Sequence, residues 1–415
     1  MDARSASGPA RGGASRPRPG ALGALGVRFR QGELGALPVV LGLLLIAAVF
    51  RLANPYFLTP LNLTNLLVQI AGVGTIAVGV VLVLLLGEID LSVGAVSGFC
   101  AAAMAVLSVK HGVPGPLAVA SGLALGLGIG LAQGAWVTKL RVPSFVVTLA
   151  GYLGWQGALL WILGSTGTIN LSDPFIVGLA NARLPVWLGW VAAALAVAVL
   201  WVGGEWGRRR RAAAGLPARS ATARAVRDAF ISAAIIGAVW LMSVNRNPRG
   251  DPRIAGIPAG VAGFLVLVVA LDRVTRRTRF GRWIYAVGGG AEAARRAGIP
   301  VDRIRTAVFA LASGLAAAGG ILAASRLFAV NQSSGGGDIL LDAIAAAVIG
   351  GTSLFGGRGT TWSALLGALV IGAITNGMDL LAFASSARFV ITGAVLLVAV
   401  TIDATARYRR ERFGR

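Results

Sequence analysis

The chain has 415 residues, of which 56% are hydrophobic and only 13% are charged. This composition excludes an ordinary soluble domain and indicates an integral membrane protein. The formal net charge of +22 would suggest nucleic-acid binding in a soluble chain. Here the basic residues fall mainly in a few breaks between apolar runs, as membrane topology requires, so we do not expect nucleic acid as a partner.

The chain contains a single cysteine, Cys100, and a single histidine, His111. One cysteine excludes an intramolecular disulfide bond, and one histidine argues against a metal site built from several histidines. We therefore expect neither a metal nor another cofactor in this chain. We interpret Cys100 as a packing residue of a helix and His111 as a loop residue.

Residues 1–35 are rich in Ser, Gly, Pro and Arg and show almost no apolar periodicity. This composition predicts a disordered basic tail rather than a signal peptide, because the apolar run that follows has no evident small-residue cleavage site. Residues 406–415 form a second basic tail. We expect both tails, and hence both termini, in the cytoplasm.

Residues 36–405 contain apolar runs long enough to cross a hydrocarbon core of about 30 Å. They predict an all-α, polytopic membrane bundle of about 12 transmembrane helices, with a lower bound of about 10, near residues 36–52, 64–86, 91–109, 115–138, 143–163, 184–203, 229–244, 255–271, 304–324, 339–356, 362–381 and 388–404. If the N-terminus lies inside, most of the 38 Lys and Arg residues fall on the cytoplasmic side. The positive-inside rule supports this orientation.

Two cytoplasmic loops are expected, near residues 204–228 and 272–303. The first carries four consecutive arginines, from Arg208 to Arg211. Such a run either keeps the loop in the cytoplasm or grips anionic lipid. We favour the first role.

Within one predicted span, glycines recur every four residues on a single helical face, at Gly122, Gly126, Gly130 and Gly134. Without side chains on that face, two helix backbones can pack closely. We interpret this glycine ladder as a structural feature of a tight bundle.

Residues 87–95, with the sequence GEIDLSVGA, place Glu88 and Asp90 between two apolar runs. A carboxylate near the membrane centre costs about 2.5 to 3.5 kcal/mol on insertion scales, so we expect a turn or a wet cavity here. Asp90 either caps the following helix by accepting hydrogen bonds from its free N–H groups or serves in such a cavity.

Residues 342–360 also place a Gly-rich polar turn between two apolar helices, which is weak evidence for an internal duplication. The glycine runs at residues 335–337 and 356–359 lack the Gly-x-x-x-x-Gly-Lys-Ser/Thr pattern of a phosphate loop. We interpret both runs as turns. No ATP site of that kind is expected in this chain.

A short polar helix is predicted between membrane-type segments, in residues 288–300. Glu292 precedes Arg296 by four residues, a favourable helical pair, while Ala293, Ala294 and Ala297 leave a face of small residues that another surface can approach. Gly298 can end the helix, and Pro300 prevents its continuation. This pattern resembles the coupling loop of ABC importer permeases, which is pressed against a separate ATPase subunit.

The chain as a whole resembles the sugar permease family of bacterial ABC importers, in the branch that serves ribose, xylose and galactose. The resemblance extends over roughly residues 36–405, through the segments 87–94, 142–151, 284–289, the Glu292 loop and 348–353. The basic insert at residues 204–228 is similar to that of the xylose members. At position 88 this chain has Glu where the family commonly has Gly, which puts the conformation of that turn in question.

The resemblance implies a permease in the bacterial inner membrane that imports xylose or a related monosaccharide. It implies a pair of permease copies, two ATPase subunits that bind ATP and Mg, and an extracytoplasmic sugar-binding protein. Glu292, Ala293, Ala294 and Gly298 would then couple the permease to the ATPase. Membrane lipid is a further expected partner.

Five polar residues are candidates for the translocation path or for structural turns, because polar groups that face lipid are costly: Gln69, Asp90, Ser92, Asn376 and Asp379. Hydrogen bonds between helices would explain them equally well. An ion-coupled secondary transporter is the alternative function, and it would use acids such as Glu88, Asp90, Asp342 and Asp379. A membrane-embedded enzyme is not expected either, because one histidine and one cysteine leave few possible catalytic or metal-binding sets of side chains.

Overall fold

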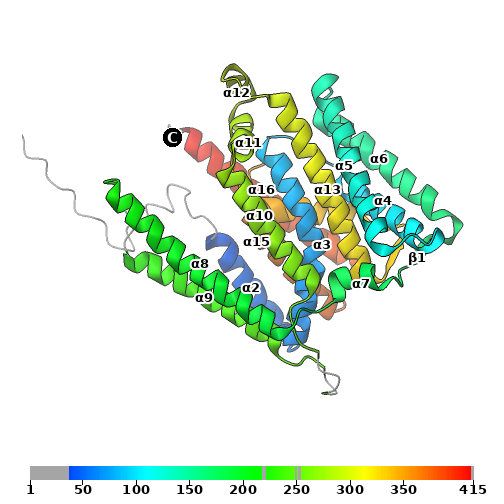
Figure 1. Ribbon diagram of the computed structural model, residues 1–415, viewed down its shortest axis with the longest axis horizontal. Coiled ribbons are helices and arrows are strands. Elements are labelled where there is room, and N and C mark those ends of the chain that lie inside the picture. Colours follow the sequence, from blue (N-terminus) through cyan, green and yellow to red (C-terminus); the bar gives the residue numbers. More distant parts are fainter. Residues whose placement is uncertain (1–36, 217–220, 248–249, 251–253, 413–415) are drawn as a thin grey trace, which may run out of the picture.

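The computed structural model describes residues 37–216, 221–247, 250 and 254–412, which fold almost entirely as helices (Figure 1). In chain order the elements are α2 (Leu37–Ala53), α3 (Pro60–Leu85), α4 (Val93–Ala105), α5 (Gly115–Lys139), α6 (Ser144–Leu163), β1 (Thr168–Asn170), α7 (Pro174–Asn181), α8 (Val186–Ala213), α9 (Ala221–Ser243), α10 (Ala259–Arg277), α11 (Arg279–Gly289), α12 (Ala291–Arg296), α13 (Val301–Leu327), β2 (Ala329–Asn331), α14 (Gly337–Ile349), α15 (Thr361–Leu380) and α16 (Ser385–Arg412). The tail predicted at residues 1–35 lies outside the described residues.

Every predicted apolar run coincides with a helix, which confirms the all-α, polytopic bundle. In the described part of the chain, 8 helices are long and apolar enough to cross a membrane, namely α3, α4 with the π-helical turn that follows it, α5, α6, α8, α9, α13 and α15. Two shorter apolar stretches, Pro38–Ala53 and Ser385–Val398, lie in α2 and α16. The two remaining runs correspond to α10 and α14.

Both segments expected as cytoplasmic loops are largely helical. α8 continues to Ala213 and α9 begins at Ala221, so the connection between them is much shorter than residues 204–228. The apolar run ends earlier than the helix because arginine is a good helix former and can extend it into water. Residues 272–303 likewise hold the end of α10 and all of α11 and α12.

The long helix α13 lies at the centre of the bundle, between α3 and α5 (Figure 1). The glycine ladder of α5 is its contact face: a methyl group added at Gly130 would overlap the backbone of Phe309, and one added at Gly134 would lie 2.7 Å from the Cα atom of Thr306. The predicted close packing of two backbones is therefore confirmed. Its partner, 172 residues away at Thr306, could not be inferred from the ladder itself.

α3 and α13 pack antiparallel, because Gly72 lies opposite Gly319 while Gly79 lies opposite Ala312. Each is followed by a short helix of 13 residues, α4 after α3 and α14 after α13. This agrees with an internal duplication whose halves have opposite orientations. It matches the turn at residues 86–92 with residues 328–336, rather than with the turn after α14 that the sequence suggested.

We call the end of the bundle that carries α12 the inner end and the opposite end, which carries β1, β2 and α7, the outer end (Figure 1). The two strands pair antiparallel, with Thr168 opposite Asn331. α8 and α9 form a hairpin that is attached at the outer end, where Arg183 bridges Pro258 and the Leu184 N–H donates to Ile257 over 2.9 Å. Only 11% and 22% of their apolar windows are buried, so the hairpin stands at the side of the bundle.

Candidate functional site

The predicted polar helix is present as α12 (Ala291–Arg296) and projects at the inner end (Figure 1). Glu292 and Arg296 form the expected ion pair, with 3.3 Å between Oε1 and Nε. A second pair joins Arg295 to Asp302 at the start of α13 over 3.2 Å. The side chain of Glu292 is 67% exposed, so its carboxylate is accessible from the aqueous side despite the pair.

α12 ends as its sequence predicts. Gly298 has a φ of +79°, in the left-handed region that favours glycine. Its N–H donates to the Arg295 carbonyl over 3.0 Å, and the Ile299 N–H donates to the Ala294 carbonyl over 3.1 Å. This is the Schellman arrangement, and it satisfies two carbonyl groups at the end of the helix.

Ala294 does not belong to the exposed small-residue face of α12. It is 5% exposed and joins the main apolar core, where the partly buried Ile299 also packs. The exposed small residues are Ala293 and Ala297. A partner that docks here would therefore meet Glu292, Ala293 and Ala297, while Ala294 holds the helix to its own protein.

Beneath α12 the backbone crosses two other segments without intervening side chains. A methyl group added at Gly288 would overlap the carbonyl oxygen of Leu85, the last residue of α3. The same carbonyl accepts a hydrogen bond of 2.9 Å from the Gly357 N–H, in the turn between α14 and α15. The end of α3, the approach to α12 and this turn are therefore locked together at one point.

The glycines of this crossing adopt backbone angles that other residues rarely accept. Gly87, Gly356 and Gly357 have φ values of +76°, +85° and +70°, so the chain turns at these glycines within the predicted segments 87–95 and 356–359. Tyr285 of α11 donates its hydroxyl to the Gly359 carbonyl over 2.8 Å. Burial raises the pKa of the Tyr285 phenol, so the donor stays protonated at neutral pH.

Glu88 is paired with Arg305 in the second turn of α13, with 2.9 Å between Oε1 and Nη2. Its side chain is 15% exposed. The preceding Gly87 supplies the positive φ that the turn requires, so Glu88 does not have to. Glutamate is therefore accommodated at position 88, and it adds a bond between the turn before α4 and α13.

Asp90 and Ser92 lie together in a buried polar cluster near the start of α4. One carboxylate oxygen of Asp90 accepts the Ser92 N–H over 2.8 Å and the Ser92 hydroxyl over 2.6 Å. Asp90 therefore stabilises the turn before α4 and does not cap N–H groups inside the helix. Gln133 of α5 donates its amide to the Ser92 hydroxyl over 3.0 Å.

The cluster continues onto α6, where Trp155 stacks on Phe99 of α4 with 5.5 Å between ring centroids. A methyl group added at Gly151 would meet both the Gln133 amide and the Trp155 ring nitrogen, so these groups face one small space. Asp90 Oδ2, Trp155 Nε1 and Gln156 Oε1 are buried without a hydrogen-bond partner among the described residues. The sequence analysis missed Gln133 and Trp155, because a lone glutamine or tryptophan in an apolar run gives no spacing signal.

The other three path candidates do not join this cluster. Asn376 of α15 and Asn62 of α3 exchange two hydrogen bonds, of 2.7 and 3.1 Å, which is the interhelical role left open above. Asp379 forms an ion pair with Arg388 at the start of α16. Gln69 is half-buried on α3 and makes no side-chain hydrogen bond to the residues that the structure describes.

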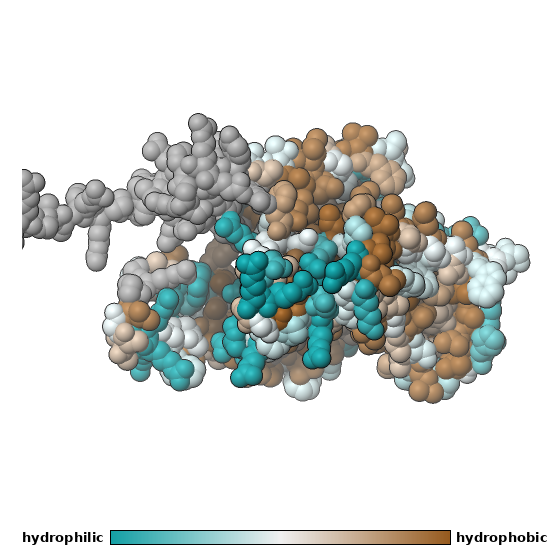
Figure 2. Space-filling model, turned by 90° about the horizontal axis from the view of Figure 1, so that it is seen from above, coloured by the Kyte–Doolittle hydropathy of each residue, from teal (hydrophilic) through white to brown (hydrophobic). Residues whose placement is uncertain are grey.

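Viewed from the inner end, hydrophilic side chains gather at the middle of the molecule, and hydrophobic ones lie mainly above and to the right of them (Figure 2). The charged residues of α12 project from this end. Within the described ranges, no group of three or more His, Cys, Asp and Glu side chains lies close enough to hold a metal ion. The geometry thus offers an exposed polar face at the inner end and a polar cluster inside the bundle.

Comparisons with known proteins agree on one family. The model of the family described as the permease component of branched-chain amino acid transport systems matches residues 62–400. The xylose transport system permease protein XylH of Escherichia coli K12 is 39% identical over 354 residues, which are 85% of this chain and 87% of that protein. XylH of Haemophilus influenzae is 35% identical over 379 residues, 91% of this chain and 98% of its own length. The ribose import permease protein RbsC of Bacillus subtilis is 32% identical over 373 residues, 90% of this chain and 94% of its own. No solved structure gives a significant match.

Proposed function

We propose, from the premise that this chain belongs to the branched-chain amino acid transport system permease family, that it is the membrane subunit of an importer of xylose or a related monosaccharide. Relatives named for xylose and ribose align with nearly the whole chain. The amino acids in the family description are a second substrate class, and the experiment below includes them. The protein acts in the bacterial inner membrane as a multi-pass permease.

The similarity to xylose and ribose permeases supports the substrate, and the crossing of Gly288, Leu85 and Gly357 beneath α12 is the observation that supports coupling to an ATPase. An ATPase that binds the exposed face of α12 would push on Gly288. The contact of Gly288 with Leu85 and Gly357 then delivers the movement to α3 and to the turn between α14 and α15. Interfaces packed this closely switch between discrete arrangements rather than deforming continuously, which suits alternating access.

The coupling residues divide into two groups on this view. Glu292 and Ala293 contact the ATPase, since both are exposed. Ala294 and Gly298 shape the helix that presents them, the first by packing inward and the second by its positive φ. ATP and Mg bind in the partner, so this chain transmits the movement of the ATPase and does not bind the nucleotide.

The translocation path runs past the cluster of Asp90, Ser92, Gln133 and Trp155. A passing sugar offers several hydroxyl groups, and the unpartnered carboxylate oxygen of Asp90 and the N–H of Trp155 can bond to them. Partly satisfied polar groups suit brief contacts, because a fully satisfied network would not need the substrate. Gln69 is a further lining residue, whereas Asn376 and Asp379 hold helices together at the outer end.

Three partner surfaces complete the proposal. A sugar-binding protein delivers substrate at the outer end, a second copy of this chain completes the permease, and lipid covers the remaining apolar surface. Both termini lie in the cytoplasm, on the side of α12. The basic residues near α8, α9, α10 and α12 support this orientation.

The test is uptake by vesicles that contain this chain with its ATPase and binding-protein partners. We expect ATP-dependent uptake of labelled xylose, competition by related sugars and no uptake without ATP. Preferential uptake of leucine over any pentose would overturn the substrate. Sugar uptake driven by a proton gradient without ATP or ATPase would establish the ion-coupled alternative instead.

A further inference from the structure

A basic pocket lies between the inner ends of α8 and α9. It has a volume of about 250 Å³ and is lined by glycines of α8, including Gly203 and Gly207, and by Arg208, Arg211, Arg224 and Arg227. α8 and α10 both begin at the outer bridge between Arg183 and Pro258, and α10 then leads to α11 and α12. The pocket therefore opens on the side of the bundle that carries α12.

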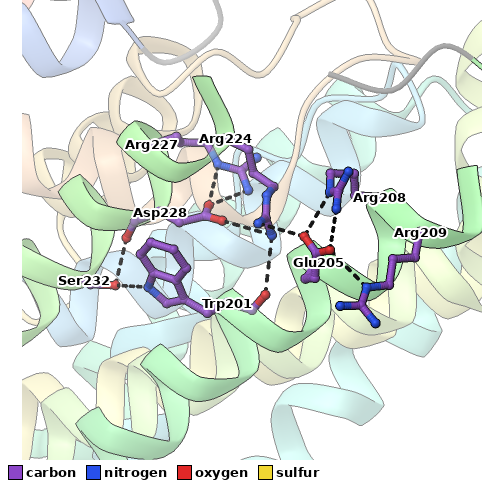
Figure 3. A network of polar contacts seen from close by, with 8 residues as sticks. All are labelled: Trp201, Glu205, Arg208, Arg209, Arg224, Arg227, Asp228 and Ser232. Atoms are coloured by element: carbon purple, nitrogen blue, oxygen red, sulfur yellow. Dashed lines mark hydrogen bonds and ion pairs between the residues drawn. The ribbon is translucent and has the colours of Figure 1, made fainter. Parts of the chain in front are cut away.

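The side chains around the pocket form a fixed network (Figure 3). The Glu205 carboxylate accepts hydrogen bonds from the guanidinium groups of three arginines, at 2.6 Å from Arg208, 3.0 Å from Arg209 and 3.0 Å from Arg224. One glutamate thus holds three guanidinium groups, and the bond to Arg224 ties α8 to α9.

The second acid, Asp228, is fully buried and pairs with Arg227 over 2.6 Å. Arg210 lies over the ring of Trp206, with its guanidinium carbon 3.8 Å from the ring centroid. Two acids thus lie among six arginines, so the cluster keeps a net positive charge; the arginines are Arg208, Arg209, Arg210, Arg211, Arg224 and Arg227.

Two of the pocket arginines retain bonding capacity. Arg211 makes no ion pair with any described residue. The Arg224 side chain is 15% exposed, and its Nε is buried without a hydrogen-bond partner in the described ranges. A buried guanidinium N–H without an acceptor is costly, so an anion in the pocket would relieve Arg224, and the exposed Arg211 can bind the same anion.

The depth of the pocket relative to the membrane follows from the tryptophans of α8. At a rise of about 1.5 Å per residue, Trp187 and Trp206 lie roughly 28 Å apart along the helix. This matches a hydrocarbon core of about 30 Å, whose two boundaries favour tryptophan. The pocket lies at the level of Trp206 and just beyond it, where the phosphates of the inner leaflet are.

We propose that this pocket binds the phosphate group of an anionic phospholipid of the inner leaflet. The arginines supply forked N–H donors that match phosphate oxygens. A methyl group added at Gly203 or Gly207 would meet nothing within 4 Å, so the glycine face leaves open space for the glycerol and the start of the acyl chains. The surrounding α8 and α9 surface is apolar and largely exposed, as lipid contact requires.

The simpler role, retention of a basic loop inside the cell, needs charge but no pocket. Arg209 separates the two roles: it lies on the same helix, carries the same charge, is 75% exposed and does not line the pocket. Gly207→Leu provides the converse test of the two roles, because it fills the pocket but keeps every positive charge. Leucine is also a better helix former than glycine, so the helix is not weakened.

The experiment is native mass spectrometry of the full chain released from phosphatidylglycerol–phosphatidylcholine nanodiscs, with retained lipids counted. We expect phosphatidylglycerol to be retained in preference to phosphatidylcholine. Arg211→Gln and Gly207→Leu should each reduce this retention about fivefold, which corresponds to about 1 kcal/mol per lost contact. Arg209→Gln should reduce it much less.

Three outcomes would overturn the proposal. These are unchanged retention in Arg211→Gln and Gly207→Leu, an equal loss in Arg209→Gln, or equal retention of the two lipids by the unaltered chain. Adding inorganic phosphate distinguishes the source of the anion. Tight binding of phosphate with no lipid preference would assign the pocket to a free anion rather than to a headgroup. None of these readouts depends on transport, so they stand whether or not the proposed function does.

Discussion

Glu88 and Arg305 form an ion pair of 2.9 Å between two segments that lie about half the chain length apart in the sequence. Glu88 lies in the turn before α4, and Arg305 belongs to α13, the central helix. Both side chains are largely buried, so each would leave an unsatisfied polar group if the other were removed.

We therefore expect Glu88→Ala and Arg305→Ala each to lower the free energy of unfolding by about 1 to 3 kcal/mol. The double variant should lose clearly less than the sum of the two, because the buried charge left by each single change is then gone. The measurement is retention of monodisperse protein in detergent after heating, as a function of temperature. Strictly additive losses would mean that the pair carries no interaction.

The second prediction concerns Gly288, whose α-carbon faces the Leu85 carbonyl, and Gly289, whose neighbourhood is open. Gly288→Ala forces the approach to α12 away from α3, and overpacking of this kind costs about 1 to 3 kcal/mol. We expect a lower unfolding temperature and a severe loss of ATP-driven uptake. Gly289→Ala should leave both nearly unchanged, and equal behaviour of the two variants would remove the crossing from the coupling route.

The third prediction concerns the exposed face of α12. Ala293→Trp places bulk where the ATPase is proposed to dock, without touching the buried Ala294. Co-purification of the ATPase should weaken about tenfold or more, which corresponds to at least about 1.4 kcal/mol, while the heating profile of the permease stays unchanged. Ala213→Trp, an exposed alanine at the inner end of α8, is the control. Full ATPase binding by Ala293→Trp would make α12 an ordinary connection.

Local patterns in the sequence predicted the elements that local physics determines. Apolar runs located the helices, and the sequence from Gly288 to Pro300 predicted α12 and its C-terminal end, because caps depend on neighbouring residues. The glycine ladder also packs as expected. The predicted end of α8 was too early, because its last turns are charged. Hydrophobicity shows where a helix lies in the membrane and does not show where the helix ends.

Contacts between distant segments could not be predicted in the same way. Nothing near Glu88 indicates Arg305, and nothing near Asn376 indicates Asn62. The Gly87, Gly288 and Gly356 segments were each recognised as turns or helix boundaries, but their meeting at one point is a property of the tertiary fold. Ala294 was assigned to the wrong face of α12 because a helix of six residues has too little periodicity to tell its faces apart.

The fourth prediction tests whether Asn376 is structural. Asn376→Leu leaves the buried amide of Asn62 without its partner and should cost about 1 to 3 kcal/mol of stability. Asn62→Leu combined with Asn376→Leu removes both amides, so part of that stability should return. If the pair only joins α3 to α15, uptake per folded molecule remains close to normal in the double variant. Abolished uptake in a well-folded double variant would instead return Asn376 to the translocation path.

The last prediction tests the polar cluster as a contact site for the passing sugar. Trp155→Phe keeps an aromatic ring against Phe99 and removes the unpartnered ring N–H together with part of the indole. The smaller ring costs some stability, so uptake is compared per folded molecule, and ATPase binding should not change. If the N–H bonds to a sugar hydroxyl during passage, uptake at low xylose concentration should fall about fivefold, the factor for a hydrogen bond worth about 1 kcal/mol. Trp161→Phe is the matched control, because Trp161 lies on the same helix and is 84% exposed, so it does not belong to the buried cluster. Uptake is measured over a range of xylose concentrations in vesicles with saturating ATP, and each value is normalised to the amount of folded permease. Equal uptake by the two variants would exclude a role for the Trp155 N–H in passage and leave the cluster as a packing feature between α4, α5 and α6.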